Sequence, residues 1–322
     1  MAHTAAETVR SRTSNTFLSP PLTIGGGAYK IPLAGTPMQR FTNCQLLACV
    51  GFALFMTACS RDPQPGTPEA AAASERMLRS MSDALAHSQA FTFETTERIE
   101  VIAPSGEKRT LHFTRAVAVR RPNALYFELR GEKGEAFHVA AYYQGRSLTL
   151  SDKLGGAWAQ TTVPGTIDEM LDDVIRRFGL PVPIGDLVSA SPYDAIIGSS
   201  AQGGLVSWGM IDQVPCAELE YADTVVGVKL WLPRSGPALP RRLEIAYKQS
   251  PIPLVTRLSF TNWKLDVPVP DTTFTFQPPA DRHPVAFGDL VSLMVSRTLP
   301  PEIQTSAPAA SDGKPASGFI AR

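Results

Sequence analysis

The sequence predicts an α+β domain in which helices lie over the concave face of a curved antiparallel sheet, a half-open β-barrel. Three observations support this prediction. Two groups of short segments show the two-residue alternation of strands, an amphipathic helical segment separates the groups, and most turns within each group are short. Short turns join antiparallel neighbours, because a parallel crossover needs about a dozen residues or more.

The first elements are expected to be a helix and a long strand. Ser74 is a favourable N-cap, and the helix that follows should end near His87, since its apolar residues recur at helical spacing. From Phe91 to Val101 the apolar residues occupy every second position, which predicts a strand with one buried face. Glu97 is the exception on the apolar side.

A helix is predicted in the middle of the domain, over residues 167–178. Thr166 and Glu169 form a capping box at its start, and Gly179 is a helix stop. Its apolar residues form one stripe, which must pack against an apolar surface. The strands expected before this helix are 109–119, 124–130, 135–143, 146–151 and 156–162.

After this helix, short helical segments at 184–190 and 192–197 are expected to precede a second group of strands. Phe274 and Phe276 are predicted to form a last short strand. Residues 281–322 are expected to be mostly disordered, because beyond about residue 297 a Pro-, Ala- and Ser-rich composition buries too little apolar surface to order itself. The folded domain is therefore predicted to span 74–280. The strands of the second group are expected at 205–211, 215–222, 225–232, 241–248 and 254–263.

An export signal precedes the domain. Residues 38–58 combine a basic start, an uncharged apolar stretch of roughly 11 residues and small residues, which is typical of a bacterial lipoprotein signal. The stretch is too short to cross a bilayer, which requires about 20 residues. The sequence Met-Thr-Ala-Cys at 56–59 resembles a lipobox, so Cys59 is the predicted lipidation site. An ordinary cleaved signal and a buried apolar segment are the alternatives.

The position of the signal also predicts the roles of the residues on either side of it. A signal normally lies at the N-terminus, so we expect residues 1–37 to be outside the mature protein, with translation starting at Met38. Residues 59–73 are rich in Pro and Ala, and we expect them to form a tether that holds the domain off a membrane.

Charge and cysteine content exclude several classes of protein. The chain has 30 basic and 30 acidic residues, of which 26 basic and 29 acidic residues follow the signal. Nucleic-acid binding is disfavoured, since it requires a basic face. Cys216 is the only cysteine after Cys59, so no disulfide is expected within the mature chain, and a small buried side chain is expected at Cys216.

No catalytic, metal or cofactor site is predicted. Asp168, Glu169, Asp172 and Asp173 form the densest acidic group, but they lie on one helix, near its positive end or four residues before an arginine. A solvated helix face accounts for them. The histidines of the mature chain do not fall at metal-ligand spacing, and the sequence has no nucleophile-elbow or phosphate-loop motif.

The apolar stripe of the central helix and the apolar faces of the strands predict a shared apolar layer. If the layer is partly open, it forms a cavity that binds acyl chains; if side chains fill it, it is a core, which the pattern alone favours. The candidate cavity-lining residues are Phe93, Phe127, Leu129, Phe137, Met170, Leu171, Val174 and Phe178.

Several short motifs occur together between residues 77 and 279. They are Arg-Arg-Pro-Asn-Ala-Leu at 120–125, Tyr-Gln-Gly-Arg-Ser-Leu-Thr-Leu at 143–150, Val-Pro-Gly-Thr-Ile-Asp at 163–168, Ser-Pro-Tyr at 191–193 and Pro-Arg-Arg-Leu at 240–243. Each motif alone is weak, but the combination resembles an uncharacterised family of predicted periplasmic proteins.

That family is similar in architecture to the lipoprotein carriers LolA and LolB, whose half-open barrel is lidded by helices over a hydrophobic cavity. The resemblance implies a non-catalytic protein, without a cofactor, that binds a lipid or an acylated ligand. It also implies a lipid-anchored protein in the periplasm, and Ser60 directly after the lipidated cysteine favours the outer membrane. The alternative is a sensor or regulator with a collapsed core that binds a periplasmic protein partner, as RseB-like proteins do.

Overall fold

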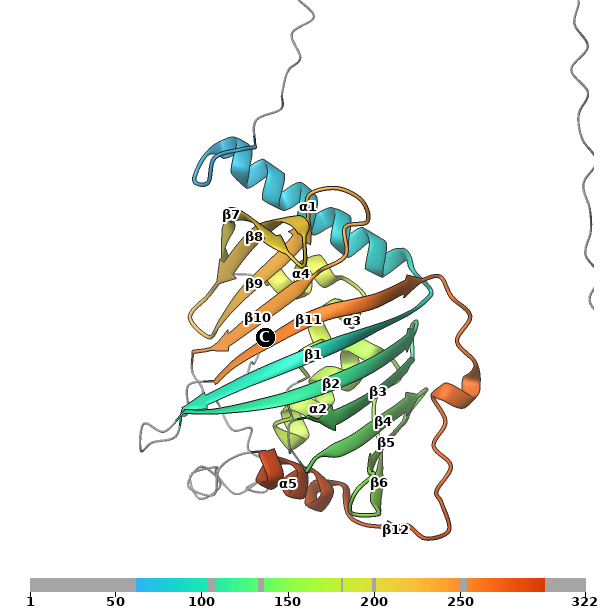
Figure 1. Ribbon diagram of the computed structural model, residues 1–322. Coiled ribbons are helices and arrows are strands. Elements are labelled where there is room, and N and C mark those ends of the chain that lie inside the picture. Colours follow the sequence, from blue (N-terminus) through green and yellow to red (C-terminus); the bar gives the residue numbers. More distant parts are fainter. Residues whose placement is uncertain are drawn as a thin grey trace, which may run out of the picture. The chain divides into compact units, whose positions relative to one another are not determined.

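The computed structural model describes residues 62–102, 108–132, 136–180, 182–198, 201–248 and 254–298 (Figure 1). All of them belong to one compact unit, Ser60–Arg322. Residues 1–37, the signal at 38–58 and the lipidation site Cys59 lie outside the described residues, so what the sequence predicts for them stays a prediction. Within the described part of the chain, no helix combines the length and apolar character needed to cross a membrane.

In the described part of the chain, twelve strands form one sheet in the order β12-β6-β5-β4-β3-β2-β1-β11-β10-β9-β8-β7 (Figure 1). All neighbours are antiparallel except β12 and β6, which run parallel. The predicted fold class, a curved antiparallel sheet with helices, is confirmed. The strands are β1 Ala90–Ile102, β2 Lys108–Arg120, β3 Ala124–Gly131, β4 His138–Gln144, β5 Ser147–Asp152, β6 Ala157–Thr162, β7 Gln202–Ile211, β8 Val214–Ala222, β9 Val226–Pro233, β10 Arg242–Tyr247, β11 Leu254–Leu265 and β12 His283–Pro284.

The helices lie against one face of this sheet, called the inner face here (Figure 1). α1 contacts β7, α3 and α4, whereas α5 lies against β5 and β6, and α2 contacts α3. Each helix contributes side chains to the same continuous core as the inner face. The described helices are α1 Pro68–His87, α2 Ile167–Phe178, α3 Gly185–Val188, α4 Pro192–Ile197 and α5 Phe287–Thr298, with a 3-10 turn at Asp271–Thr273.

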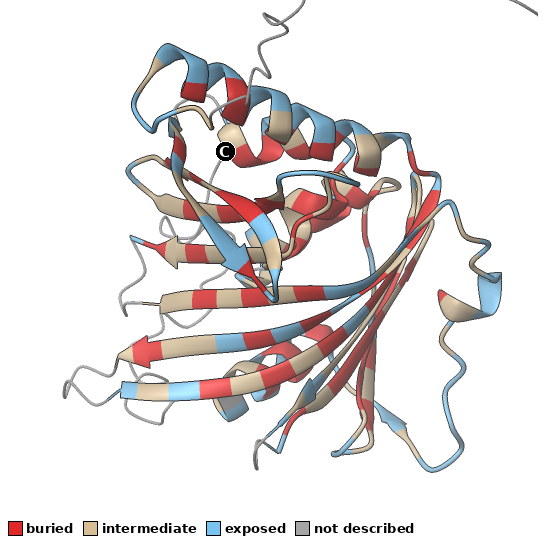
Figure 2. Cartoon of the chain, turned by 45° about the horizontal axis from the view of Figure 1, so that its top comes forward, coloured by how far each residue is buried: buried red, intermediate tan, exposed pale blue. Residues whose placement is uncertain are grey.

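The alternation of the strands produces continuous apolar rows across the inner face. One row runs from Phe93 on β1 through Val117, Phe127 and Ala141 to Leu150 on β5, each residue directly opposite the next. Intervening residues point to the other face of the sheet, and Figure 2 shows the resulting alternation of buried and exposed positions. These rows form the wall on which α2 packs.

The N-terminal boundary of the domain differs from the prediction. α1 begins at Pro68, because the Thr67 side chain accepts a hydrogen bond from the Ala70 amide (3.2 Å) and caps the helix. Ser74 lies inside the helix and donates to the Ala71 carbonyl (2.8 Å), so the predicted cap at Ser74 is wrong. Residues 68–73, expected as tether, are helical because the alanines there have the highest helix propensity and Ala70 and Ala73 are buried.

The C-terminal boundary also moves. Phe274 is not in a strand; it follows the 3-10 turn and is buried beside the Arg120 guanidinium, 4.9 Å from its ring centroid. Residues 283–298, expected to be disordered, form β12 and α5. The sequence signal for α5 is apolar residues that recur at helical spacing and become buried in the structure. Those residues are Phe287, Leu290, Val291 and Met294.

Candidate functional site

The apolar layer between α2 and the sheet is the candidate site. The space that remains in it is about 20 Å³, close to the volume of one water-sized sphere, so side chains nearly fill the layer. We call this space the hollow. It is lined by Leu125, Phe127, Ala141, Tyr143, Leu148, Leu150, Met170, Leu171, Val174, Leu180 and Val182.

Four of the eight predicted lining residues border the hollow: Phe127 from β3, and Met170, Leu171 and Val174 from α2. The other four lie elsewhere or at the margin. Phe93 and Phe137 are buried in aromatic contacts, Phe93 with Trp263 and Phe137 with Phe113. Leu129 and Phe178 are half-buried, and the Phe178 ring contacts Phe287 at 4.6 Å.

Seven lining residues are absent from the prediction. Five of them come from β3, β4 and β5, in two adjacent inner rows, and Leu180 and Val182 follow α2. Their strands were predicted, so pairing the strands in register would have brought the five together. Tyr143 is the one lining residue with a polar group, and its hydroxyl donates to the Pro164 carbonyl at 3.0 Å. Burial raises the pKa of Tyr143 to about 12.

Local sequence chemistry fixes the position of α2 over the hollow. The Thr166 side chain accepts a hydrogen bond from the Glu169 amide (3.3 Å), as the capping box predicts. The Thr166 hydroxyl also donates to the Glu169 carboxylate (2.8 Å). Gly179 ends the helix with φ of 61°, a left-handed conformation that suits glycine. Arg177 donates to the Thr162 carbonyl at 3.0 Å and thereby joins the end of α2 to β6.

Two acidic residues of α2 make specific contacts, one within the helix and one outside it. Asp173 is buried and pairs with both Arg176 and Arg177, whereas the sequence predicts Arg177 alone as its partner. Asp168 accepts a hydrogen bond from the Ala190 amide (3.0 Å) and so connects α2 to the segment after α3. The predicted solvated face is wrong at Asp173, which is buried where it pairs with the two arginines. Within the described residues, no group of three or more acidic, His or Cys side chains is arranged to hold a metal.

A second tie holds the helices to the sheet at the β2–β3 turn. The Arg121 guanidinium donates to the carbonyl of Val188 on α3 (3.0 Å) and to that of Leu85 on α1 (3.3 and 3.4 Å). Desolvation lowers the pKa of Arg121. Because the three bonds end on backbone carbonyls of two helices, Arg121 links both helices to the turn between β2 and β3.

A buried ion pair lies on the inner face beside the hollow. Arg115 donates to both carboxylate oxygens of Glu97 (2.6 and 3.0 Å), and the Thr95 hydroxyl donates to the same carboxylate (2.8 Å). The side chains of Glu97 and Arg115 are 0% and 5% exposed. Arg115 also lies 5.0 Å from the ring centroid of Phe127, a lining residue of the hollow. The exceptional Glu97 of the sequence pattern thus has a partner that the sequence does not identify.

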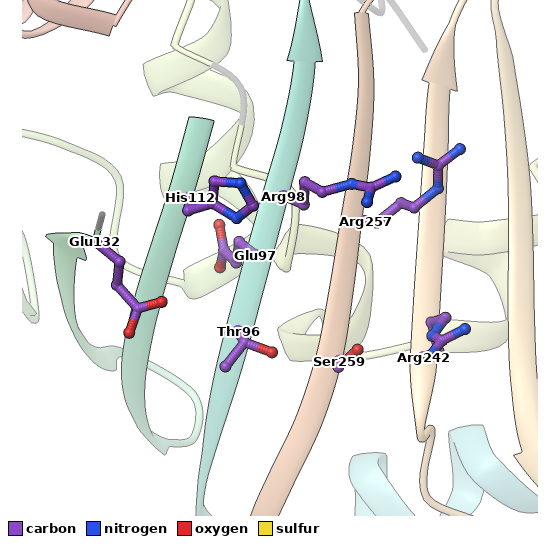
Figure 3. Close-up of a pocket in the computed structure, with 8 residues that line it drawn as sticks. All are labelled: Thr96, Glu97, Arg98, His112, Glu132, Arg242, Arg257 and Ser259. Carbon is purple, nitrogen blue, oxygen red and sulfur yellow. The ribbon is translucent and has the colours of Figure 1, made fainter. Parts of the chain in front are cut away.

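The opposite face of the sheet carries a polar depression of about 510 Å³ (Figure 3). Two of its three arginines form ion pairs: Arg257 contacts Glu244 (2.5 Å) and Glu100 (2.7 Å), and Arg98 contacts Glu100 (2.5 Å). The third, Arg242, lies over the Trp231 ring, 5.8 Å from its centroid. Desolvation by burial raises the pKa of Glu100, but Arg257 and Arg98 outweigh it and hold this pKa below its ordinary value. Exposed ion pairs of this kind contribute little each. We therefore assign the depression to a solvated ion-pair network.

Many solved structures are similar to this chain, including the following three. A LolA-superfamily protein from Nitrosomonas europaea is 14% identical, has a TM-score of 0.30, and the match covers 63% of this chain and 97% of that chain. Lipoprotein LppX of Mycobacterium tuberculosis is 13% identical, with a TM-score of 0.38, over 62% of this chain and 98% of LppX. A chain of the Pseudomonas aeruginosa MucA/MucB complex is 17% identical, with a TM-score of 0.35, over 66% of this chain and 63% of that one.

The family assignment comes from the sequence. No curated protein matches the chain. The sequence profile of DUF2092, described as a predicted periplasmic protein, matches residues 74–288. This range holds β1 to β11, α2 and every residue that lines the hollow, and it exceeds half of the 322 residues. The chain therefore belongs to the DUF2092 family of predicted periplasmic proteins.

Proposed function

We propose that the chain is a non-catalytic periplasmic lipoprotein that binds a lipid or an acylated ligand between α2 and β3–β5. The observation that carries this proposal is the composition of the hollow, in which every lining side chain is apolar except Tyr143, whose hydroxyl is already bonded. Such a layer accepts methylene groups without leaving a polar group unpaired. The family description supports the periplasm, and Cys59 with Ser60 supports a lipid anchor at the outer membrane.

Ligand uptake requires the helical lid to move. Small-molecule sites usually have volumes of about 300–1,000 Å³, whereas the hollow has about 20 Å³. The rim is partly accessible, because Phe127, Leu180 and Val182 are only half-buried. Polar ties of α2 to the sheet and to the segment after α3 include those of Arg177 and Asp168. We propose that an acyl chain enters at this rim and displaces α2 from the wall.

The second candidate function is partner binding by a periplasmic sensor or regulator with a collapsed core. The small volume of the hollow favours it, because a filled layer serves as a core without any ligand. In this alternative the partner is a periplasmic protein, and the inner face binds no lipid.

Native mass spectrometry with organic extraction tests the first proposal. The chain from Ser60 is exported behind an ordinary cleavable signal, purified from the periplasm and examined for bound lipid, then titrated with a fluorescent fatty acid. A bound, extractable lipid supports the proposal and identifies the ligand chemistry. A protein that carries no lipid and takes up no fatty acid contradicts the proposal and favours partner binding.

A pair of variants separates uptake from stability. Leu171→Gln places an amide in the lining of the hollow, and Leu243→Gln places one in the core on β10, outside the lining. Both should lose about 1–3 kcal/mol of unfolding free energy, because each buries an amide without assured partners. We expect only Leu171→Gln to reduce fatty-acid uptake beyond its loss of stability. Equal effects of both variants on uptake would indicate a packed core.

A further inference from the structure

The chain is fixed to the domain almost as soon as it leaves the lipidation site. The Trp208 indole donates to the Pro63 carbonyl at 3.1 Å, and Asp62 pairs with Arg234 at the end of β9. The Arg234 guanidinium lies 5.6 Å from the Trp208 ring centroid. The residues expected to form a flexible tether therefore dock against β7 and β9 from Asp62 onward.

The strand that receives this segment exposes apolar side chains. β7 is the last strand of the sheet and pairs only with β8 among the described strands. Met210 is 61% exposed and Val206 is 43% exposed, which makes two of the four exposed large apolar residues in the described part of the chain. Met210 lies two positions after Trp208, on the same side of β7.

We propose that the corner formed by Val206, Trp208 and Met210 rests on the surface of the membrane that holds the lipid anchor. This inference depends on the proposed lipidation of Cys59. Only Ser60 and Arg61 separate Cys59 from the docked Asp62, a reach of about 10 Å when fully extended. The headgroup layer of a bilayer is about 5–8 Å thick on each side. The docked segment and the corner beside it therefore lie within reach of the headgroups.

The chemistry of the corner fits a lipid headgroup layer. Tryptophan is enriched at membrane interfaces, and moving the Met and Val side chains out of water lowers the free energy. Asp212 and Gln213 form the turn after β7, both with positive φ (47° and 65°) and both exposed. Their polar side chains limit insertion of the hairpin to the headgroup level.

Spin-label depth measurements test the proposal. The full chain is produced with its own signal, purified with its anchor, and reconstituted in vesicles of phosphatidylethanolamine and phosphatidylglycerol. A nitroxide is attached to Met210→Cys and, as a matched control, to Leu154→Cys, which is 58% exposed after β5 on the other half of the sheet. Cys216 is buried and should remain unlabelled, which the parent protein checks. Collision rates with oxygen and with a water-soluble nickel chelate report the depth of each label.

In vesicles, we expect the label at 210 to be several-fold less accessible to the nickel chelate than the label at 154. In soluble protein that lacks the anchor, measured without detergent, we expect the two labels to be equally accessible. Mass spectrometry of the same sample determines whether Cys59 carries a lipid. A lipidated protein whose label at 210 is as accessible as that at 154 overturns the membrane contact alone. A Cys59 without lipid overturns the anchor and this inference with it. If the label at 210 is protected from the nickel chelate in the absence of vesicles, a polypeptide covers the corner instead of a membrane, which also overturns the inference.

Discussion

Glu97→Leu is expected to lower the free energy of unfolding by about 3–5 kcal/mol, the cost of breaking a buried ion pair by removing one partner. The substitution leaves the Arg115 guanidinium, which is 5% exposed, without the carboxylate that accepts two of its hydrogen bonds. The Thr95 hydroxyl loses its acceptor at the same time. For a domain of about 150–250 residues, this loss corresponds to a decrease in Tm of about 6–20 °C.

The double variant Glu97→Leu/Arg115→Met should recover most of that loss. Replacing a whole buried pair by apolar residues is often neutral or stabilising, so we expect a net cost of about 1 kcal/mol or less. The two apolar side chains lie on the inner face, where Phe127 already provides an apolar neighbour for position 115. The coupling energy of the pair is the difference between the double variant and the sum of the two single variants.

Urea unfolding followed by tryptophan fluorescence measures these free energies. Glu75→Leu is the matched control, because Glu75 pairs with Arg79 at 2.8 Å on the exposed side of α1, with both side chains more than half exposed. The control should cost less than about 1 kcal/mol. The reasoning is refuted if Glu97→Leu costs no more than the control, or if the double variant costs as much as both single variants together.

Three further predictions concern the helices and the free cysteine. Arg121→Met removes the hydrogen bonds to α1 and α3, so amide hydrogen exchange in α3 should become faster while global stability changes little; unchanged exchange would contradict the proposed tie. Desolvation by burial raises the pKa of Asp152, but the hydrogen bond from the Gly155 amide and the contact with Arg297 outweigh it, so the pKa lies below its ordinary value. The stability that the ionised Asp152 contributes is therefore complete above pH of about 4 and is lost as the pH falls further. Asp152→Asn should therefore lose less stability than the parent between pH 6 and pH 3, and parallel pH profiles would argue against this. Burial raises the pKa of the Cys216 thiol, so iodoacetamide should modify the native chain much more slowly than the urea-unfolded chain at pH 8, and equal rates would show an accessible thiol.

Features that depend on neighbouring residues could be predicted from the sequence. The bounds of α2 follow from Thr166, Glu169 and Gly179, because capping is a local interaction that needs no knowledge of the fold. The strands of the first group are found within a few residues for a similar reason, since alternation and turn residues are read directly from the chain. The predicted cap at Ser74 is wrong because several polar residues precede the helix and each can cap it. Thr67 is the cap in the structure, and the alanine run that follows it forms the first turns of α1.

Features that depend on contacts between distant residues are missed when the strands are predicted one at a time, without their pairing. Glu97 and Arg115 are 18 positions apart and meet because β1 and β2 pair in a register that brings Thr95 opposite Arg115. Leu180 and Val182 come after the helix end at Gly179 and line the hollow, which depends on the path of the chain beyond α2. The distance between α2 and the sheet is likewise not encoded in the hydrophobic pattern. The pattern therefore does not distinguish a filled core from an open cavity, whereas the structure does.

The closed hollow and the proposed acyl ligand are compatible only above a certain chain length. Displacing α2 returns Met170, Leu171 and Val174 to water, at about 1.5–3 kcal/mol each, or about 5–9 kcal/mol in all. Each buried methylene contributes about 0.8 kcal/mol, so about 6–11 methylenes are needed to offset the opening. In displacement titrations with a fluorescent fatty acid, we expect hexanoate to compete weakly and palmitate to compete strongly, with a steep rise between them. Equal competition by both would show that the ligand does not replace α2 on the wall, and the absence of competition by palmitate would leave partner binding as the better account of this fold.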